Sequence, residues 1–175
     1  MARHSKIDFD DLVREFAAMV SRIASTYEKR PALIEELTQD IFLAVFRALP
    51  SYRGDASLKT FVARIANNVG VDHVRKATRR LQEVDVTFAQ SVADPDSDQE
   101  DAADLSLKRD RLVMAVRALD LPLKQVVSLH LEGFTNAEIA ETLSLKANNV
   151  GVRLHRAKTE LAQRMNTAPK HEVAV

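Results

Sequence analysis

Hydrophobic residues recur every three or four positions through most of the chain, the spacing that lines one face of an α-helix. In the N-terminal half this pattern predicts three helices, over about residues 8–27, 31–49 and 57–80. Asp8 and Ser57 precede two of them and are residue types that cap helix N-termini. Only 4 Gly and 5 Pro occur among the 175 residues, so we expect an all-α fold.

The same spacing continues in the C-terminal half, where it predicts four further helices over about residues 105–119, 121–133, 136–143 and 147–165. The third of these begins with a capping box, in which Thr135 and Glu138 satisfy each other's backbone N–H groups. A short turn joins it to the last helix. A short helix, a turn and a longer helix are typical of a helix-turn-helix domain.

The segment between the two halves has a different composition. Residues 81–107 contain no Lys or Arg but many Asp and Glu, and few hydrophobic residues follow Phe88. Such a segment buries too little surface to offset the ~1–2 kcal/mol of backbone entropy that each ordered residue costs. We therefore expect two small helical domains, residues 1–80 and 108–166, joined by a flexible acidic linker at 81–107 and followed by a disordered tail at 167–175.

Charge and composition exclude several functional classes. The 25 Lys and Arg balance 25 Asp and Glu, so the chain is neither uniformly basic nor uniformly acidic. It has no Cys, no apolar signal segment and no run long enough to span a bilayer, so we expect a cytoplasmic protein without direct membrane insertion. The five His are scattered and no nucleophile or phosphate-loop motif occurs, so we expect no enzyme activity, no catalytic residue, no metal site and no cofactor.

The last predicted helix has a polar face suited to reading DNA. When its apolar stripe points inward, the opposite face carries Arg, Asn and His, which can bond to base edges, and Lys, which can bond to phosphates. The residues of this face and its flanks are Lys146, Asn148, Asn149, Val152, Arg153, His155, Arg156 and Lys158. The alternative is a solvated surface helix in an ordinary helical hairpin.

A second basic face is predicted on the third helix. Between residues 53 and 80 there are seven Lys and Arg against two Asp, and helical geometry groups Arg64, Asn67, Asn68, Val71 and Arg75 on one side, away from the apolar stripe. With an aromatic residue, Tyr52, in the preceding loop, this face suits single-stranded or distorted DNA, because rings stack on bases and cations follow phosphates. A solvated helix face is the alternative.

The second predicted helix has an acidic face. It consists of Glu35, Glu36, Gln39 and Asp40 beside apolar positions. An acidic rim around apolar residues is a candidate for protein docking, and an ordinary amphipathic helix is the alternative.

Five segments together resemble the extracytoplasmic-function sigma factors of the sigma-70 family. They are residues 36–42 (ELTQDIF), 52–61 (YRGDASLKTF), 64–68 (RIANN), 138–141 (EIAE) and 150–158 (VGVRLHRAK). Each segment is weakly specific alone, and the resemblance rests on their order and separation over nearly the whole chain.

The resemblance implies an alternative sigma factor that binds core RNA polymerase and directs promoter-specific initiation under the control of an anti-sigma factor. Residues 1–80 would form region two and residues 108–166 region four. The second helix would dock on the clamp helices of the largest polymerase subunit through Glu35, Glu36, Leu37, Gln39, Asp40 and Phe42. Minus-ten promoter DNA would contact Tyr52, Arg53, Lys59, Arg64, Asn67, Asn68, Asp72 and Arg75. The polar face of the last helix would contact the minus-thirty-five element, and the acidic linker would enter the polymerase's basic channels.

The sequence departs from the family pattern at a few positions. Phe61 stands where the family usually has Trp, and Gly151-Val152 replaces a usual basic residue and Ser on the recognition helix. Gly151 and the zero net charge favour a first alternative, a sigma-mimicking module that binds an anti-sigma factor without touching DNA. A second alternative is a dimeric helix-turn-helix regulator, which requires a two-fold symmetric site.

Overall fold

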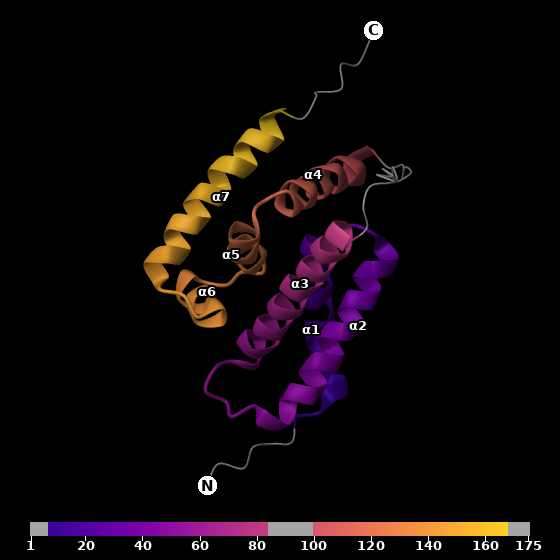
Figure 1. Cartoon of the computed structure of the whole chain (residues 1–175), viewed down its shortest axis with the longest axis vertical. Helices are drawn as coiled ribbons and strands as arrows, with labels where there is room; N and C mark the ends of the chain where they lie inside the picture. Colours follow the sequence, from indigo (N-terminus) through magenta and orange to yellow (C-terminus); the bar gives the residue numbers. More distant parts are fainter. Residues whose placement is uncertain (1–6, 84–99, 168–175) are drawn as a thin grey trace.

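The computed structural model describes residues 7–83 and 100–167, and in these two stretches the chain is helical without strands (Figure 1). The predicted all-α fold is confirmed. The elements are α1 (Phe9–Tyr27), α2 (Pro31–Ala48), the short 3-10 helix η1 (Leu49–Ser51), α3 (Leu58–Glu83), α4 (Glu100–Arg117), α5 (Leu121–Leu131), α6 (Asn136–Leu143) and α7 (Ala147–Thr167).

Helices α1, α2 and α3 pack together as an N-terminal domain. The Asp8 carboxylate accepts a hydrogen bond from the Asp10 N–H at 2.8 Å, and the Ser57 hydroxyl accepts one from the Thr60 N–H at 3.0 Å, so both predicted caps are present. Between these caps the apolar stripes of the three helices meet in one core. Its largest fully buried side chains are Leu12, Val20, Ile23, Leu37, Ile41, Val45 and Val62.

Helices α4 to α7 form the second domain, with α6, a turn and α7 as its helix-turn-helix. The predicted capping box is present, since the Thr135 N–H donates to Glu138 Oε2 at 2.7 Å and the Glu138 N–H donates to the Thr135 hydroxyl at 3.3 Å. Ser144 ends α6 in the left-handed conformation, with φ of 54°, which turns the chain sharply toward α7. The core of this domain contains Val116, Val126, Leu129, Ile139, Val150 and Ala157.

Both helices beside the predicted linker are longer than expected. α3 continues through Glu83 and α4 begins at Glu100, so the linker boundaries of 81 and 107 enclose helical residues at both ends. The start of α4 is acidic and rich in Ala, and both features favour a helix N-terminus. The expected linker between these helices, residues 84–99, and the expected tail from residue 168 lie outside the described residues.

The two domains contact each other along one side of the N-terminal domain. α1 packs against α4 and α5, and α3 packs against α5 and α6 (Figure 1). Helix α7 lies on the side of the second domain away from α1 and α2. This arrangement determines which of the candidate site residues are exposed.

We expect Gly70→Ala to destabilise the N-terminal domain by about 2 kcal/mol, although alanine favours a helix. A Cβ at Gly70 would lie under 3.0 Å from three ring atoms of Tyr27, whose ring is buried. The two tyrosines of the chain, Tyr27 and Tyr52, both belong to this domain, so their near-ultraviolet signal during urea unfolding measures its stability.

Gly151→Ala is the matched control for this substitution. Gly151 is also helical, in α7, but a Cβ there would meet no atom within 4 Å. Alanine at position 151 should therefore leave the N-terminal domain unchanged and stabilise the second domain by up to ~1 kcal/mol. Equal effects of the two substitutions would contradict the packing of Tyr27 on Gly70.

Candidate nucleic-acid and protein-docking interfaces

Helix α7 presents the polar face that its sequence predicts. Val150, Leu154 and Ala157 are buried against the rest of the second domain. The predicted DNA-facing side chains Lys146, Asn148, Asn149, Val152, His155, Arg156 and Lys158 are all exposed, and Arg153 is half-buried at the flank. Val152 is 60% exposed, which leaves its methyl groups available for apolar contact.

Gly151 does not interrupt α7, which runs through it without a break. Its lack of a side chain leaves open space beside the exposed face. The exposed face of α7 therefore has the hydrogen-bond donors and acceptors of a helix that reads bases. Gly151, which has no side chain, contributes no contact to it.

The loop before α3 has a defined internal structure. The Tyr52 hydroxyl donates to the Ala56 carbonyl at 2.7 Å, and the Tyr52 ring lies 4.9 Å from the Phe61 ring. Gly54 occupies the turn between them with φ of 80°, a conformation that glycine adopts without strain. Tyr52 is therefore half-buried at the base of a closed loop, whose exposed tip carries Arg53, Gly54 and Asp55.

The predicted minus-ten residues of α3, apart from Asn67, divide into two groups. Asn68, Asp72 and Arg75 are exposed, with Arg75 3.9 Å from Asp72 one turn away. Lys59 and Arg64 are half-buried because they face the second domain. Lys59 and Arg64 therefore contact the second domain, whereas Asn68, Asp72 and Arg75 are exposed to solvent.

Asn67 does not lie on the exposed face where helical geometry alone placed it. Its side chain is 1% exposed, and its Oδ1 accepts a hydrogen bond from the Tyr27 hydroxyl at 2.6 Å. Val71 is also buried, at 7% exposure. Asn67 faces α1 through Tyr27, so the buried part of α3 is wider than the apolar stripe indicates and Asn67 lies in the core of the domain.

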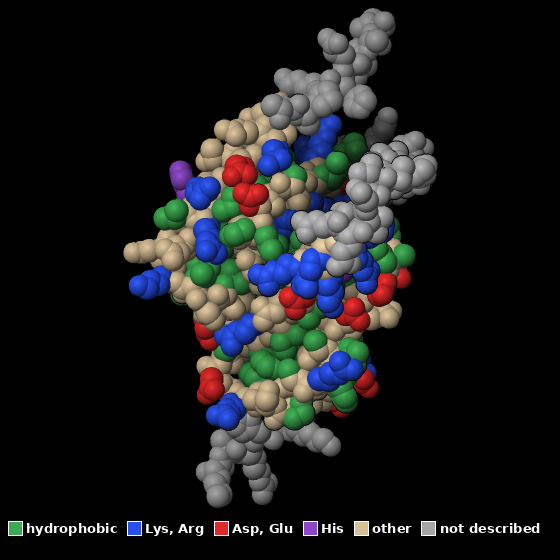
Figure 2. All heavy atoms as spheres, in the orientation of Figure 1, with side chains coloured by type: hydrophobic (Ala, Val, Ile, Leu, Met, Phe, Trp, Pro, Cys, Tyr) green, Lys and Arg blue, Asp and Glu red, His purple; other side chains and the backbone are tan. Residues whose placement is uncertain are grey.

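The C-terminal half of α3 carries an exposed cluster of cations. It consists of Arg75, Lys76, Arg79 and Arg80. Figure 2 shows the Lys and Arg side chains gathered over this part of the molecule. A closely spaced cluster of this kind attracts a polyanion and is the strongest basic feature of the described part of the N-terminal domain.

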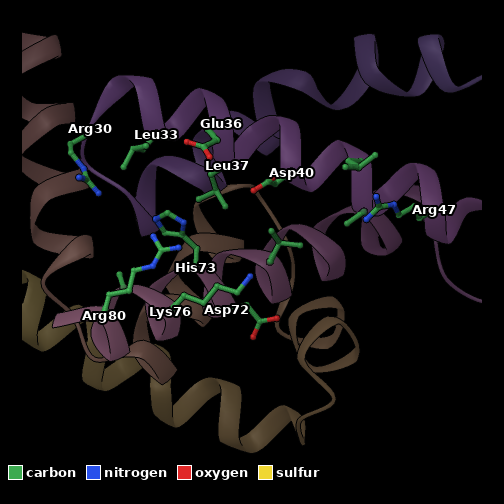
Figure 3. Close-up of a pocket in the computed structure, with 14 residues that line it drawn as sticks. Arg30, Leu33, Glu36, Leu37, Asp40, Arg47, Asp72, His73, Lys76 and Arg80 are labelled. Carbon is green, nitrogen blue, oxygen red and sulfur yellow. The ribbon is translucent and has the colours of Figure 1, made fainter. Parts of the chain in front are cut away.

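A groove between α2 and α3 is lined by charged side chains of both signs. Glu36, Asp40 and Arg47 enter it from α2, and Asp72, Lys76 and Arg80 enter it from α3 (Figure 3). Along α2 the predicted docking residues Glu35, Glu36, Gln39 and Asp40 are exposed. Beside them Leu43 and Phe46 are exposed hydrophobic side chains, at 46% and 55%. The combination is suited to docking of a protein helix.

Two predicted docking residues are less exposed than the others. Leu37 is 2% exposed and belongs to the core, so it does not offer a contact surface. Phe42 is half-buried and packs edge-on against Phe9, with 6.5 Å between ring centroids. Phe9 also contacts Phe46 at 5.1 Å, so the aromatic residues of α2 are held by α1.

A buried carboxylate between α1 and α2 was not predicted from the sequence. Glu28 is 7% exposed and accepts hydrogen bonds from the Lys29 and Arg30 N–H groups at 2.8 and 3.0 Å and from the Arg30 guanidinium at 3.1 and 3.2 Å. His73 Nε2 lies 2.9 Å from its Oε2. Burial alone would raise the pKa of Glu28, but the hydrogen bonds from Arg30, His73 and Lys29 outweigh it and lower the pKa to about 2.

Comparisons with known proteins agree with the two-domain arrangement. Residues 12–80 match the family model of sigma-70 region 2, and residues 109–161 match that of sigma-70 region 4. The chain is 32% identical to the ECF RNA polymerase sigma factor SigE of Mycolicibacterium smegmatis over 87% of its own length. The chain belongs to the extracytoplasmic-function (ECF) branch of the sigma-70 family. Sigma factors are transcription initiation factors rather than catalysts.

Other ECF sigma factors align over most of the chain. It is 27% identical to SigM of Mycobacterium tuberculosis over 89% of its length and 76% of that relative, whereas it spans 60% of the length of SigE. The fold is similar to that of the sigma factor RpoE of Bartonella quintana in complex with the anti-sigma factor NepR, with a TM-score of 0.71, 21% identity and coverage of 91% and 99% of the two chains. It is also similar to CnrH in complex with the cytosolic domain of CnrY, with a TM-score of 0.67, 22% identity and coverage of 92% and 89%.

Within residues 7–83 and 100–167 no helix combines the length and the apolar character that crossing a bilayer requires.

Proposed function

We propose that this chain binds core RNA polymerase and directs promoter-specific transcription initiation as an alternative sigma factor. The observation that carries the proposal is the presence of two separate candidate DNA surfaces in two family-matched domains of one chain. One is the exposed polar face of α7, and the other is the aromatic loop and α3 of the N-terminal domain. A sigma factor needs two such surfaces because its promoters contain two separated elements.

We assign recognition of the minus-thirty-five element to α7. Arg156 and His155 project from the exposed face, and Arg153 lies at its edge. In the major groove an Arg can bond to guanine O6 and N7, and the neighbouring Lys146 and Lys158 can bond to phosphates. Exposed Val152 can contact a thymine methyl group.

We assign recognition and melting of the minus-ten element to the loop at residues 52–57 and the exposed part of α3. The loop is held by Tyr52 and Gly54, so it can receive an extruded base without first becoming ordered. Asn68 and Arg75 lie along the path of the unpaired strand. Extruding a base costs a few kcal/mol, and capture of the unpaired strand by stacking and phosphate contacts offsets this cost. No catalytic group is required.

We assign docking on core polymerase to the exposed face of α2. Glu35, Glu36, Gln39 and Asp40 form its acidic rim, and Leu43 and Phe46 supply adjacent apolar area. By resemblance to the family, the partner surface is the pair of clamp helices of the largest subunit. Leu37 supports this face from within the core rather than contacting the partner.

An anti-sigma factor is the proposed regulatory partner. Two solved structures that share this fold are complexes, one with the anti-sigma factor NepR and one with the cytosolic domain of CnrY. The apolar residues exposed on α2, Leu43 and Phe46, offer a surface that such a partner could cover in competition with core polymerase.

The decisive experiment is transcription from fragmented bacterial DNA by sigma-free core polymerase, with and without the purified chain, followed by sequencing of transcript 5′ ends. We expect new start sites that share two upstream elements at a fixed spacing. A folded chain that neither binds core polymerase nor yields new transcripts would contradict the proposal. Retained binding to an anti-sigma factor in that case would support the sigma-mimicking alternative.

A further inference from the structure

Val152 is an apolar side chain in the middle of the polar face of α7. Successive residues of a helix are rotated by about 100°, so Val152 points almost directly away from the buried stripe of α7. It is 60% exposed. The neighbours one turn before and one turn after it are all exposed and all polar, namely Asn148, Asn149, His155 and Arg156. An apolar centre is therefore surrounded by side chains that form hydrogen bonds.

This arrangement matches one feature of the DNA major groove. The edges of the base pairs present hydrogen-bond donors and acceptors there, and thymine alone adds a methyl group. The amide of an Asn and the guanidinium of an Arg can bond to adenine and guanine edges, whereas the two methyl groups of Val152 can form only apolar contacts. A thymine flanked by base pairs with polar contacts is the surface that complements this face.

The side chain of Val152 is short, so it reaches a base only if the backbone of α7 comes close to the DNA. The adjacent flank of the helix permits this approach. Gly151 has no side chain, and a Cβ there would meet no atom within 4 Å. One turn earlier on the same flank lies Ala147, which is exposed and carries a single methyl group. No long side chain at these two positions holds the helix away from the groove.

The charges near Val152 identify the occupant as a nucleic acid. Lys146 lies directly before α7, and Arg156 and Lys158 lie one to two turns after Val152. All three cations are exposed, and cations beside a base-reading helix bond to phosphates and fix its position. An apolar group between such cations is suited to a polyanion that carries a methyl group in its groove.

We propose that Val152 selects thymine at one position of the minus-thirty-five element, by contact between its methyl groups and the thymine methyl group. The inference rests on the proposed function, which places α7 in the major groove, and it adds the identity of a base. This thymine lies between a base pair contacted by Asn149 and one contacted by Arg156. Those two residues are separated by about 10 Å along the helix, which corresponds to about three base-pair steps.

Removal of a single methyl group from the DNA tests the contact. Deoxyuridine lacks only the methyl group of thymine and keeps all of its hydrogen bonds. In a promoter found by mapping transcript 5′ ends, each thymine of the minus-thirty-five element, on either strand, is replaced in turn by deoxyuridine. With the reconstituted wild-type holoenzyme, we expect replacement at one position to reduce transcription by about 4-fold, the effect of one buried methyl group.

The result separates this inference from the proposed function. Transcription that is insensitive to every replacement would overturn the role of Val152 and leave the sigma-factor function intact. Failure to obtain any promoter-dependent transcript would overturn the proposed function, and the inference with it.

Val152→Ala assigns the sensitivity to this side chain. Alanine removes both Cγ methyl groups at an exposed position and favours a helix, so the fold is retained. Thymine and deoxyuridine templates should then give equal transcription. Met165→Ala is the matched control, because Met165 is also exposed on α7, at 42%, but lies about 20 Å further along the helix. It should keep the 4-fold difference, and a difference of that size in Val152→Ala would contradict the assignment.

Selection from a template pool provides an independent measurement. The sensitive position is randomised to all four bases, and the transcribed templates are sequenced. Wild-type holoenzyme should enrich thymine by at least about 4-fold over cytosine, which has no methyl group. Val152→Asn places a polar amide at the same site and should lose this enrichment. Equal enrichment of thymine by wild type and Val152→Asn would show that another side chain selects the base.

Discussion

Reversing the charge at Arg153 and Arg156 together should reduce transcription from promoters that need the minus-thirty-five element by roughly 100-fold or more. Each side chain is assigned one contact to a base or phosphate, and a good contact of this kind contributes about 1–3 kcal/mol. Loss of two such contacts corresponds to about 3 kcal/mol, and the introduced carboxylates add repulsion from the phosphates. The measurement is promoter-dependent transcription by the reconstituted holoenzyme.

Two further variants distinguish the recognition of bases from a general effect of the protein's net charge. Arg153→Lys with Arg156→Lys keeps the positive charge but loses two-point bonding to guanine, so an intermediate loss of about 10-fold is expected. Arg14→Glu changes the net charge at an exposed position of α1 and should leave transcription unchanged. Unaltered transcription by the charge-reversed protein, with core affinity intact, would remove α7 from promoter recognition.

Helix positions were predictable from the sequence because each depends on residues close together in the chain. The caps at Asp8 and Ser57 and the capping box at Thr135 involve groups two or three residues apart. The apolar spacing of α7 predicted both its buried and its exposed sides correctly. For the same reason the helix-turn-helix and its polar face were found without knowledge of the tertiary structure.

Features that depend on distant residues were not predictable in this way. Asn67 is buried because Tyr27 of α1 bonds to it, and Leu37 is buried in the core that the three helices share, so a helical projection of α2 or α3 alone does not predict either. The ion pair between Arg22 of α1 and Glu132, which follows α5, joins residues 110 positions apart, and neither residue belongs to a motif. Its only local signal is that Glu132 lies directly before Gly133, at the end of α5.

Glu28 is the residue whose ionisation should matter most for the stability of the N-terminal domain. It lies between α1 and α2, and its partners come from the start of α2 and, through His73, from α3. The carboxylate therefore joins the end of α1 and the start of α2 to the middle of α3. Because its pKa is lowered to about 2 in the folded protein, from an ordinary value of 4.5, the folded state binds the proton less tightly than the unfolded state does.

This difference sets the sign of the pH dependence. The stabilisation is fully present above about pH 4.5 and is lost progressively as the pH falls toward 2, where Glu28 becomes protonated in the folded state too. At neutral pH it amounts to about 3 kcal/mol. We expect Glu28→Gln to lower the free energy of unfolding by about 2–3 kcal/mol at pH 7, with the difference from wild type shrinking below pH 4.5.

Urea unfolding followed by the near-ultraviolet signal of Tyr27 and Tyr52 at a series of pH values measures this difference in the domain that contains Glu28. Glu15→Gln is the control, because Glu15 is exposed on the same helix and its removal should change the stability by less than ~0.5 kcal/mol at every pH. A gap between wild type and Glu28→Gln that stays constant from pH 7 to pH 3 would show that the side chain acts through packing rather than charge. A gap that closes on acidification would instead identify the ionised carboxylate as the group that joins the three helices.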